Sequence, residues 1–212
     1  MIYAKLLSKY GGVFHGFATR DESDQGIKDL VLAEQIHRDK ISDVDGDDLG
    51  KKIKSVDGLV TKISRVNIGV RTADCLPILF YEPKAKIVAA VHAGWKGTLL
   101  KISPKMIKKI ESLGGKAKNI IAAIGPHICG SCYTIPKARV KLFAEKAIRQ
   151  KDGEFHLDLA LFNFKQLVSS GVNKKNIEIL PYCTVCQNNL FFSFRKDKGK
   201  DYGEMLAMIG LI

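Results

Sequence analysis

Short apolar runs along the chain predict buried β-strands. Residues 76–81 and 87–92 are almost entirely apolar, and Glu82-Pro83-Lys84 between them predicts a hairpin turn. Neither run alternates with polar residues, so we expect both strands to be covered on both faces. The same reasoning predicts strands at residues 3–7, 13–19, 59–61, 120–124, 177–180 and 190–194. Gly11-Gly12 predicts that the first two of these form a hairpin.

Helical periodicity appears in four places. Ser103-Pro104 predicts the start of a helix, with Ser103 as N-cap, and Gly114-Gly115 predicts its end. Further helices are predicted at residues 137–149, 157–170 and 203–209. Strands and helices mix without strict alternation and no linker divides them. The sequence therefore predicts an α+β fold in one domain over residues 1–212, with stacked mixed β-sheets and helices on the outside.

Composition narrows the classes of function. The apolar runs are far too short to span a bilayer, and residues 1–10 are interpreted as a first strand and not as a signal peptide. The net charge of +12 would attract phosphate-bearing ligands. The lysines are scattered, however, and no stripe of basic and aromatic residues alternates, so we expect neither a specific nucleic-acid site nor a membrane partner. A nucleic-acid-binding module remains an alternative supported by the charge alone.

Three residues near strand ends suggest a metal centre. His37, Cys75 and His92 offer two imidazoles and a thiol, which suit zinc, and three protein ligands leave one position open, as in catalytic zinc sites. The predicted hairpin brings Cys75 and His92 to the same open end of two strands. The alternative is a buried core histidine and a small buried thiol. Asp74 argues against that alternative, because a carboxylate beside a buried thiol needs a partner.

Nine segments in order make the chain resemble a known family. They are HGFATR (15–20), QIH (35–37), DGLVT (57–61), TADCLP (72–77), HAGWKGT (92–98), IGP (124–126), CY (132–133), LDL (157–159) and FFSFR (191–195). Together they closely resemble the purine nucleoside phosphorylase family long described as multicopper polyphenol oxidoreductase, or laccase-domain, proteins. The resemblance spans nearly the whole chain, and the ADCLP and HAGWKG segments are the most specific.

The resemblance carries expectations about activity. It implies a zinc held by His37, Cys75 and His92, phosphorolysis of adenosine, inosine, guanosine and methylthioadenosine, and deamination of adenosine. Its partners would be a purine nucleoside and phosphate. Residues 21–34 form a shorter stretch than relatives usually carry, so nucleoside contacts from that stretch are not carried over to this chain.

Two further groups of residues are candidates for binding. Phosphorolysis needs cationic donors for phosphate, and Arg71 and Arg195 are the first candidates, followed by Lys96. Surface solvation or ion pairing is the alternative role for each of them. Separately, Cys129, Cys132, Cys183 and Cys186 form two CxxC pairs, which indicate a structural zinc, separate thiols or one reversible disulfide. An odd total of five cysteines favours the reducing cytoplasm.

The sequence thus predicts a cytoplasmic, zinc-dependent purine nucleoside phosphorylase with adenosine deaminase activity. Cys75, His92 and Asp74 are its predicted catalytic residues, with Asp74 as proton shuttle. One alternative is a copper polyphenol oxidase, since the same ligands accept copper, although five histidines in the chain are few for several coppers. Another is a hydrolase with Cys75 as nucleophile and His92 as base.

Overall fold

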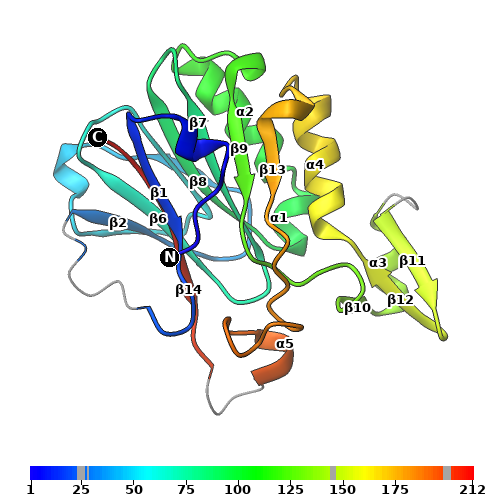
Figure 1. Ribbon diagram of the computed structural model, residues 1–212. Helices are drawn as coiled ribbons and strands as arrows, with labels where there is room; N and C mark the ends of the chain where they lie inside the picture. Colours follow the sequence, from blue (N-terminus) through cyan, green and yellow to red (C-terminus); the bar gives the residue numbers. More distant parts are fainter. Residues whose placement is uncertain (23–26, 28, 144–146, 198–201) are drawn as a thin grey trace.

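Two large β-sheets stacked face to face form the centre of the protein in the computed structural model (Figure 1). The structure describes residues 1–22, 27, 29–143, 147–197 and 202–212. The first sheet has the order β1-β14-β6-β2-β4 and the second the order β13-β9-β7-β8-β5-β3. The strands of the first are β1 (Val13–Phe17), β14 (Met205–Leu211), β6 (Asn67–Thr72), β2 (Leu30–Glu34) and β4 (Lys52–Lys54). Those of the second are β13 (Ile177–Ile179), β9 (Ile121–Ile124), β7 (Leu76–Glu82), β8 (Ile87–Ala93), β5 (Gly58–Thr61) and β3 (Ile41–Asp43).

Strand β8 shows why its sequence lacks polar residues. Ile87, Ala89 and Val91 face the helices, whereas Val88 and Ala90 face the first sheet, and all five are fully buried. Both faces of the strand therefore lie in a hydrophobic core. The predicted hairpin of β7 and β8 is confirmed, because the two strands pair antiparallel along their full lengths.

Helices cover the outer face of the second sheet (Figure 1). They are α1 (Trp95–Leu99), α2 (Ile102–Ser112) and α4 (Leu159–Ser169). Helix α2 begins before Ser103, so the prediction of Ser103 as N-cap is wrong. The hydroxyl of Ser103 instead donates a 2.8 Å hydrogen bond to Asn163, which links α2 to α4. No helix within the described ranges is long and apolar enough to cross a membrane.

A small third sheet, β10-β12-β11, projects beyond the helices (Figure 1). It contains β10 (Thr134–Ile135), β12 (Glu154–Leu157) and β11 (Ile148–Lys151). The prediction of one helix over residues 137–149 is wrong: α3 (Lys137–Val140) is short, β11 occupies the end of that range, and residues 144–146 lie outside the described part. The mostly exposed residues of β11 pair with β12, and this pairing makes the segment a strand instead of a helix.

Other local predictions also fail where long-range pairing decides the structure. Residues 203–209 were expected to be helical but contribute to β14, which pairs with β1 on one side and β6 on the other. The predicted strand at residues 3–7 and its hairpin with residues 13–19 are wrong: only Ile2 pairs with Phe17 of β1, and the segment then enters a 3-10 turn at Leu7–Lys9. No strand forms at residues 190–194, where α5 (Phe194–Asp197) begins.

Single 3-10 turns complete the described elements: Leu7–Lys9, Gly46–Asp48, Ala117–Asn119 and Lys174–Asn176. The observed fold is nevertheless the expected α+β architecture with helices outside mixed sheets.

Candidate metal centre and its cavity

The structure brings His37, Cys75 and His92 together from three separate segments. His92 lies on β8, Cys75 directly precedes β7, and His37 follows β2. One ligand atom from each lies within 4.8 Å of the ligand atoms of the other two. In the hairpin, Pro77 is level with His92, which places Cys75 at the end of β7 that lies beside the imidazole. Three donors of these types in one small volume match an open zinc site.

Asp57 organises two of the three ligands. Its fully buried carboxylate lies 2.8 Å from Nδ1 of His92, so it accepts the Nδ1–H hydrogen and leaves Nε2 for a metal. The same carboxylate accepts hydrogen bonds from the backbone N–H groups of Ile36, His37 and Arg38, at 3.3, 2.9 and 2.8 Å. These bonds hold His37 at a φ of 57°, a left-handed conformation that is costly for histidine. Asp57 belongs to the DGLVT segment, but nothing in the local sequence pattern predicts this role.

Gly94 leaves the space that the ligands occupy. A Cβ added at Gly94 would lie 3.0 Å from Sγ of Cys75, 3.5 Å from Cε1 of His92 and 3.7 Å from Cδ2 of His37. Any other residue would therefore press on the thiol. The small residue in the HAGW segment is explained by this close approach of backbone to ligand atoms.

The electrostatic interaction between Cys75 and His92 favours an ionised thiolate at Cys75. Burial alone would raise the pKa of the Cys75 thiol, but the charge of His92 and hydrogen bonds from His37 and His92 lower it to about 7. Burial alone would lower the pKa of His92, but the charge of Cys75 and the hydrogen bond to Asp57 raise it to about 9. Each group stabilises the charged form of the other, and a thiolate is the form that binds metals and attacks electrophiles.

A cavity of about 390 Å³ opens directly onto this centre. Four aromatic and three arginine side chains line it, together with polar groups around the ligands. The lining comprises Gln35, His37, Arg71, Thr72, Ala73, Asp74, Cys75, His92, Trp95, Ile128, Tyr133, Arg139, Leu159, Phe194, Arg195, Tyr202 and Glu204. The predicted residues Arg71, Asp74 and Arg195 are thus beside the metal centre. Lys96 is exposed on α1 outside this lining.

Asp74 and Arg195 connect the centre to the last part of the chain. Asp74 Oδ1 accepts a 2.6 Å hydrogen bond from Thr184, and Oδ2 accepts a 2.7 Å bond from the backbone N–H of Arg195. The Arg195 guanidinium donates to the side chain and carbonyl of Thr134 at 2.6 and 3.0 Å. Both residues therefore shape the wall of the cavity as well as lining it.

Arg139 is a cavity residue that sequence reasoning missed. Its guanidinium carbon lies 4.0 Å from the ring centroid of Trp95, and Nη1 donates to the Tyr133 hydroxyl at 3.3 Å. The residue lies on α3, in a segment with no family motif. Only the fold brings it into the same cavity as the candidate ligands His37, Cys75 and His92.

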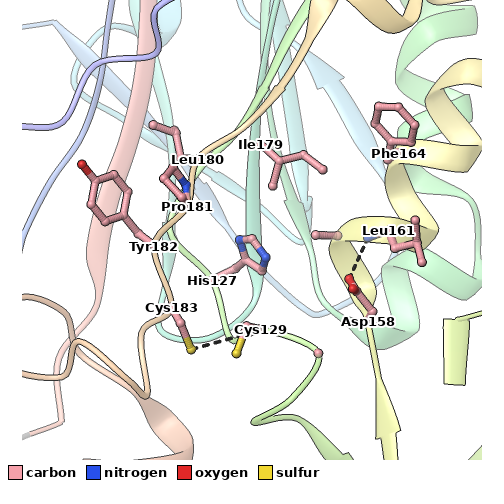
Figure 2. A pocket seen from close by; sticks show the side chains of 12 residues that line it. His127, Cys129, Asp158, Leu161, Phe164, Ile179, Leu180, Pro181, Tyr182 and Cys183 are labelled. Carbon is pink, nitrogen blue, oxygen red and sulfur yellow. Dashed lines mark hydrogen bonds between the residues drawn. The ribbon is translucent and has the colours of Figure 1, made fainter. Parts of the chain in front are cut away.

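A second cavity, of about 530 Å³, lies between α4 and the segment after β13 (Figure 2). Its lining is mostly apolar. Asp158 there caps α4 by accepting a 2.8 Å hydrogen bond from the N–H of Leu161, and Nδ1 of His127 lies 2.8 Å from the Gly125 carbonyl. This cavity contains none of His37, Cys75 and His92, so the cavity lined by those three residues is the candidate active site.

Comparison with known proteins identifies the family of the chain. The model of the family described as multi-copper polyphenol oxidoreductase laccase matches residues 18–212. The chain belongs to this family. Within the laccase-type family, purine nucleoside phosphorylase YlmD of Bacillus subtilis is 33% identical over 206 residues, which cover 90% of this chain and 74% of that relative. Adenosine deaminase RL5, from an unknown prokaryotic organism, is 33% identical over 185 residues, which cover 80% and 71%.

A solved structure from the laccase-type family has the same fold. The crystal structure of YlmD from Geobacillus stearothermophilus superposes with a TM-score of 0.89 at 28% identity, covering 98% of this chain and 94% of that one. The resemblance expected from the nine sequence segments is therefore confirmed.

Proposed function

We propose that this protein is a zinc-dependent purine nucleoside phosphorylase that also deaminates adenosine. The observation that carries the proposal is the meeting of His37, Cys75 and His92 in the lining of a cavity that also has aromatic and arginine side chains. The names of the relatives, purine nucleoside phosphorylase and adenosine deaminase, support the substrate class. The cavity volume lies in the usual range of about 300–1,000 Å³ for small-molecule sites.

The donor set fits zinc. Two imidazoles and a thiolate are borderline to soft ligands, Asp57 fixes the tautomer of His92, and Gly94 leaves room for the thiol. Zinc, when bound, would supply a Lewis acid to this cavity. The chain's own residues then have to bind the nucleoside, bind the anion and move protons.

Phe194 and Tyr202 are proposed to bind the purine ring. Both line the cavity, and their ring centroids lie 5.8 Å apart in an edge-to-face arrangement. Phe194 is 69% exposed, which is unusual for a phenylalanine unless a partner covers it. A flat aromatic base whose face stacks here would bury that surface.

The arginines are proposed to bind phosphate. Arg71, Arg139 and Arg195 all line the cavity, and the fork of a guanidinium matches phosphate oxygens. Lys96 remains a weaker candidate because it lies outside this lining. In phosphorolysis a phosphate oxygen bonds to the anomeric carbon of the ribose as the bond from that carbon to the purine nitrogen breaks. The purine then takes up a proton.

Asp74 is proposed as the group that moves protons. Each of its oxygens accepts one hydrogen bond and retains a further lone pair. In deamination, water adds to the purine carbon that bears the amino group, and ammonia leaves. Asp74 would carry the proton from the water to the departing nitrogen.

A copper polyphenol oxidase is less well supported. All five histidines of the chain lie in the described part, and only His37 and His92 join the metal group. The His15 Nε2 atom accepts a hydrogen bond from the backbone of Ala4, and His156 lies on β12. A centre with several coppers needs more clustered imidazoles than these.

A cysteine hydrolase is the second candidate, because Cys75, His92 and Asp57 form a line of nucleophile, base and orienting carboxylate. The lowered pKa of Cys75, about 7, favours it. Chelation separates the two hypotheses. A hydrolase keeps its activity without metal, whereas the proposed phosphorylase loses it.

The proposal is tested by incubating the protein with adenosine, with and without phosphate, and identifying the products by chromatography. We expect adenine and ribose 1-phosphate only with phosphate, and inosine under both conditions. Absence of all three products from zinc-loaded protein would contradict the proposal.

A further inference from the structure

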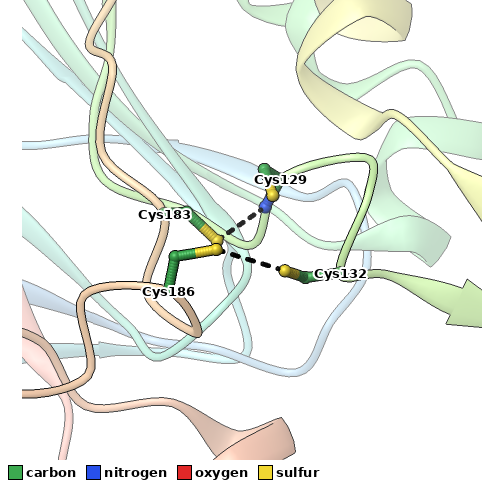
Figure 3. Close-up of side chains that lie close together, drawn as sticks. All are labelled: Cys129, Cys132, Cys183 and Cys186. Atoms are coloured by element: carbon green, nitrogen blue, oxygen red, sulfur yellow. Dashed lines mark hydrogen bonds between the residues drawn. The ribbon is translucent and has the colours of Figure 1, made fainter.

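The four remaining cysteines of the chain form one compact cluster (Figure 3). The Sγ atoms of Cys129, Cys132, Cys183 and Cys186 all lie within 4.8 Å of one another. Those of Cys132 and Cys186 are 3.4 Å apart. Four sulfurs arranged tetrahedrally around zinc at 2.3 Å lie about 3.8 Å apart, so the cluster is close to the geometry of a four-thiolate site.

The fold explains a spacing that is too long for an ordinary zinc motif. Strands β9 and β13 pair in parallel, with Ile177 level with Ala122 and Ile179 level with Ile124. The two segments continue side by side after the strands end, where His127 bridges to Cys183. Each segment then turns through its own CxxC. The long interval between the two pairs is therefore absorbed by the helix α4 and the small third sheet.

Backbone N–H groups point at the sulfur of Cys183. The N–H of Cys129 donates to it across the two segments at 3.4 Å. The backbone groups of Cys186 and Val185 also form hydrogen bonds to this sulfur. Such N–H groups around a sulfur partly neutralise its charge, as a metal-bound thiolate requires.

Two other roles fit the geometry less well. Packing as small apolar groups does not explain the cluster, because Cys186 is exposed and Cys129 and Cys132 are only partly buried. A Cys132–Cys186 disulfide would use two thiols and require an oxidant. It would leave the approach of Cys129 and Cys183 unexplained.

We propose that Cys129, Cys132, Cys183 and Cys186 bind one structural zinc ion, independently of the metal centre in the cavity. Sulfur fills all four coordination positions, so the zinc would stabilise the fold and leaves no position for substrate. The zinc cross-links the segment after β9 to the segment after β13.

This cross-link supports the wall of the cavity. Thr184 lies inside the second CxxC and donates its 2.6 Å hydrogen bond to Asp74. Ile128 and Tyr133 flank the first CxxC and line the cavity. Loss of the zinc should therefore loosen the contacts that hold Asp74 as well as lower the stability of the fold.

The test measures the zinc content of a variant that lacks the thiol ligand of the metal centre in the cavity. Cys75→Ala protein, purified from zinc-containing medium under reducing conditions, should retain one zinc per chain, with sulfur as the only neighbour in X-ray absorption spectra. Adding Cys129→Ser and Cys186→Ser should remove that zinc, while adding Ser131→Ala, a change in the same loop, should keep it.

Three results would overturn the inference. They are a zinc-free Cys75→Ala protein, a Cys132–Cys186 disulfide found by mass spectrometry in protein kept reduced, and iron in place of zinc. If the double serine change prevents folding, the absorption spectrum of Cys75→Ala decides alone. The outcome is independent of the proposed enzyme activity, because no substrate takes part in the measurement.

Discussion

The carboxylate of Asp57 lies 2.8 Å from Nδ1 of His92 and also accepts the backbone N–H of His37 at 2.9 Å. One buried side chain thus orients one metal ligand and holds the backbone of another. This arrangement makes the centre rigid before any metal binds, because both ligands depend on the same fixed acceptor.

Asp57→Asn should weaken zinc binding at the cavity while the fold is retained. The amide keeps only one of the two oxygens that accept the N–H groups of the His37 loop and the Nδ1–H of His92, and it lacks the charge that raises the basicity of His92. We expect about 10–100-fold lower zinc affinity, measured by competition with a chelating dye. Asp43→Asn, at an exposed ion pair with Lys109, is the matched control. Equal affinity in the two variants would contradict the role given to Asp57.

Gly94→Ala should displace the thiol ligand. The φ of Gly94 is −71°, so alanine is allowed by the backbone, and the effect comes only from the Cβ placed 3.0 Å from Sγ of Cys75. We expect a zinc affinity lower than that of the wild type and of Gly11→Ala, where an added Cβ meets nothing within 4 Å. Wild-type affinity in Gly94→Ala would show that the thiol is not held against this backbone.

The alkylation of Cys75 should depend on pH as a lowered pKa requires. The thiolate is the reactive form, and its pKa of about 7 means that the reaction rate rises as pH increases through 7 and levels off above it. The measurement is iodoacetamide labelling of Cys75 after chelator treatment, followed by peptide mass spectrometry. His92→Gln removes the neighbouring positive charge and should move the midpoint to higher pH. A wild-type midpoint near the ordinary thiol value would contradict the ion pair.

Arg195→Ala should impair phosphorolysis of inosine more than deamination of adenosine. The first reaction needs a bound phosphate and the second does not, so loss of one guanidinium should cost about 10–100-fold in kcat/KM for phosphorolysis only. Arg149→Ala, an exposed arginine on β11, is the control. An equal loss of both activities would assign Arg195 to the wall of the cavity, through its bonds to Thr134, and leave phosphate to Arg71 and Arg139.

The sequence predicted the parts of the site that depend on local pairing. A turn at Glu82-Pro83-Lys84 joins two adjacent strands, so the approach of Cys75 to His92 followed from counting residues along a hairpin. The α+β class followed from the mixture of predicted strands and predicted helices without strict alternation. His37 was a candidate because of its ligand type near a predicted strand end, and the family resemblance then implied that it shares a zinc with Cys75 and His92; its spacing alone did not predict that the three meet.

What the sequence missed depends on pairing between distant segments. Met205–Leu211 is buried along its whole length, and such a run has no period that separates strand from helix; its place between β1 and β6 decides. Arg139 reaches the cavity only because the fold brings its guanidinium over the ring of Trp95, far away in the sequence. The second CxxC meets the first because β9 and β13 run in parallel, which no local pattern shows.

The central claim is that the centre of His37, Cys75 and His92 supports phosphate-dependent cleavage of a purine nucleoside. Its most direct test follows hypoxanthine and ribose 1-phosphate formed from inosine by zinc-loaded wild type and by folded His92→Ala, each with and without phosphate. We predict equal amounts of both products from the wild type with phosphate, none without phosphate, and none from His92→Ala. Hypoxanthine released equally without phosphate, or undiminished in His92→Ala, would contradict the account.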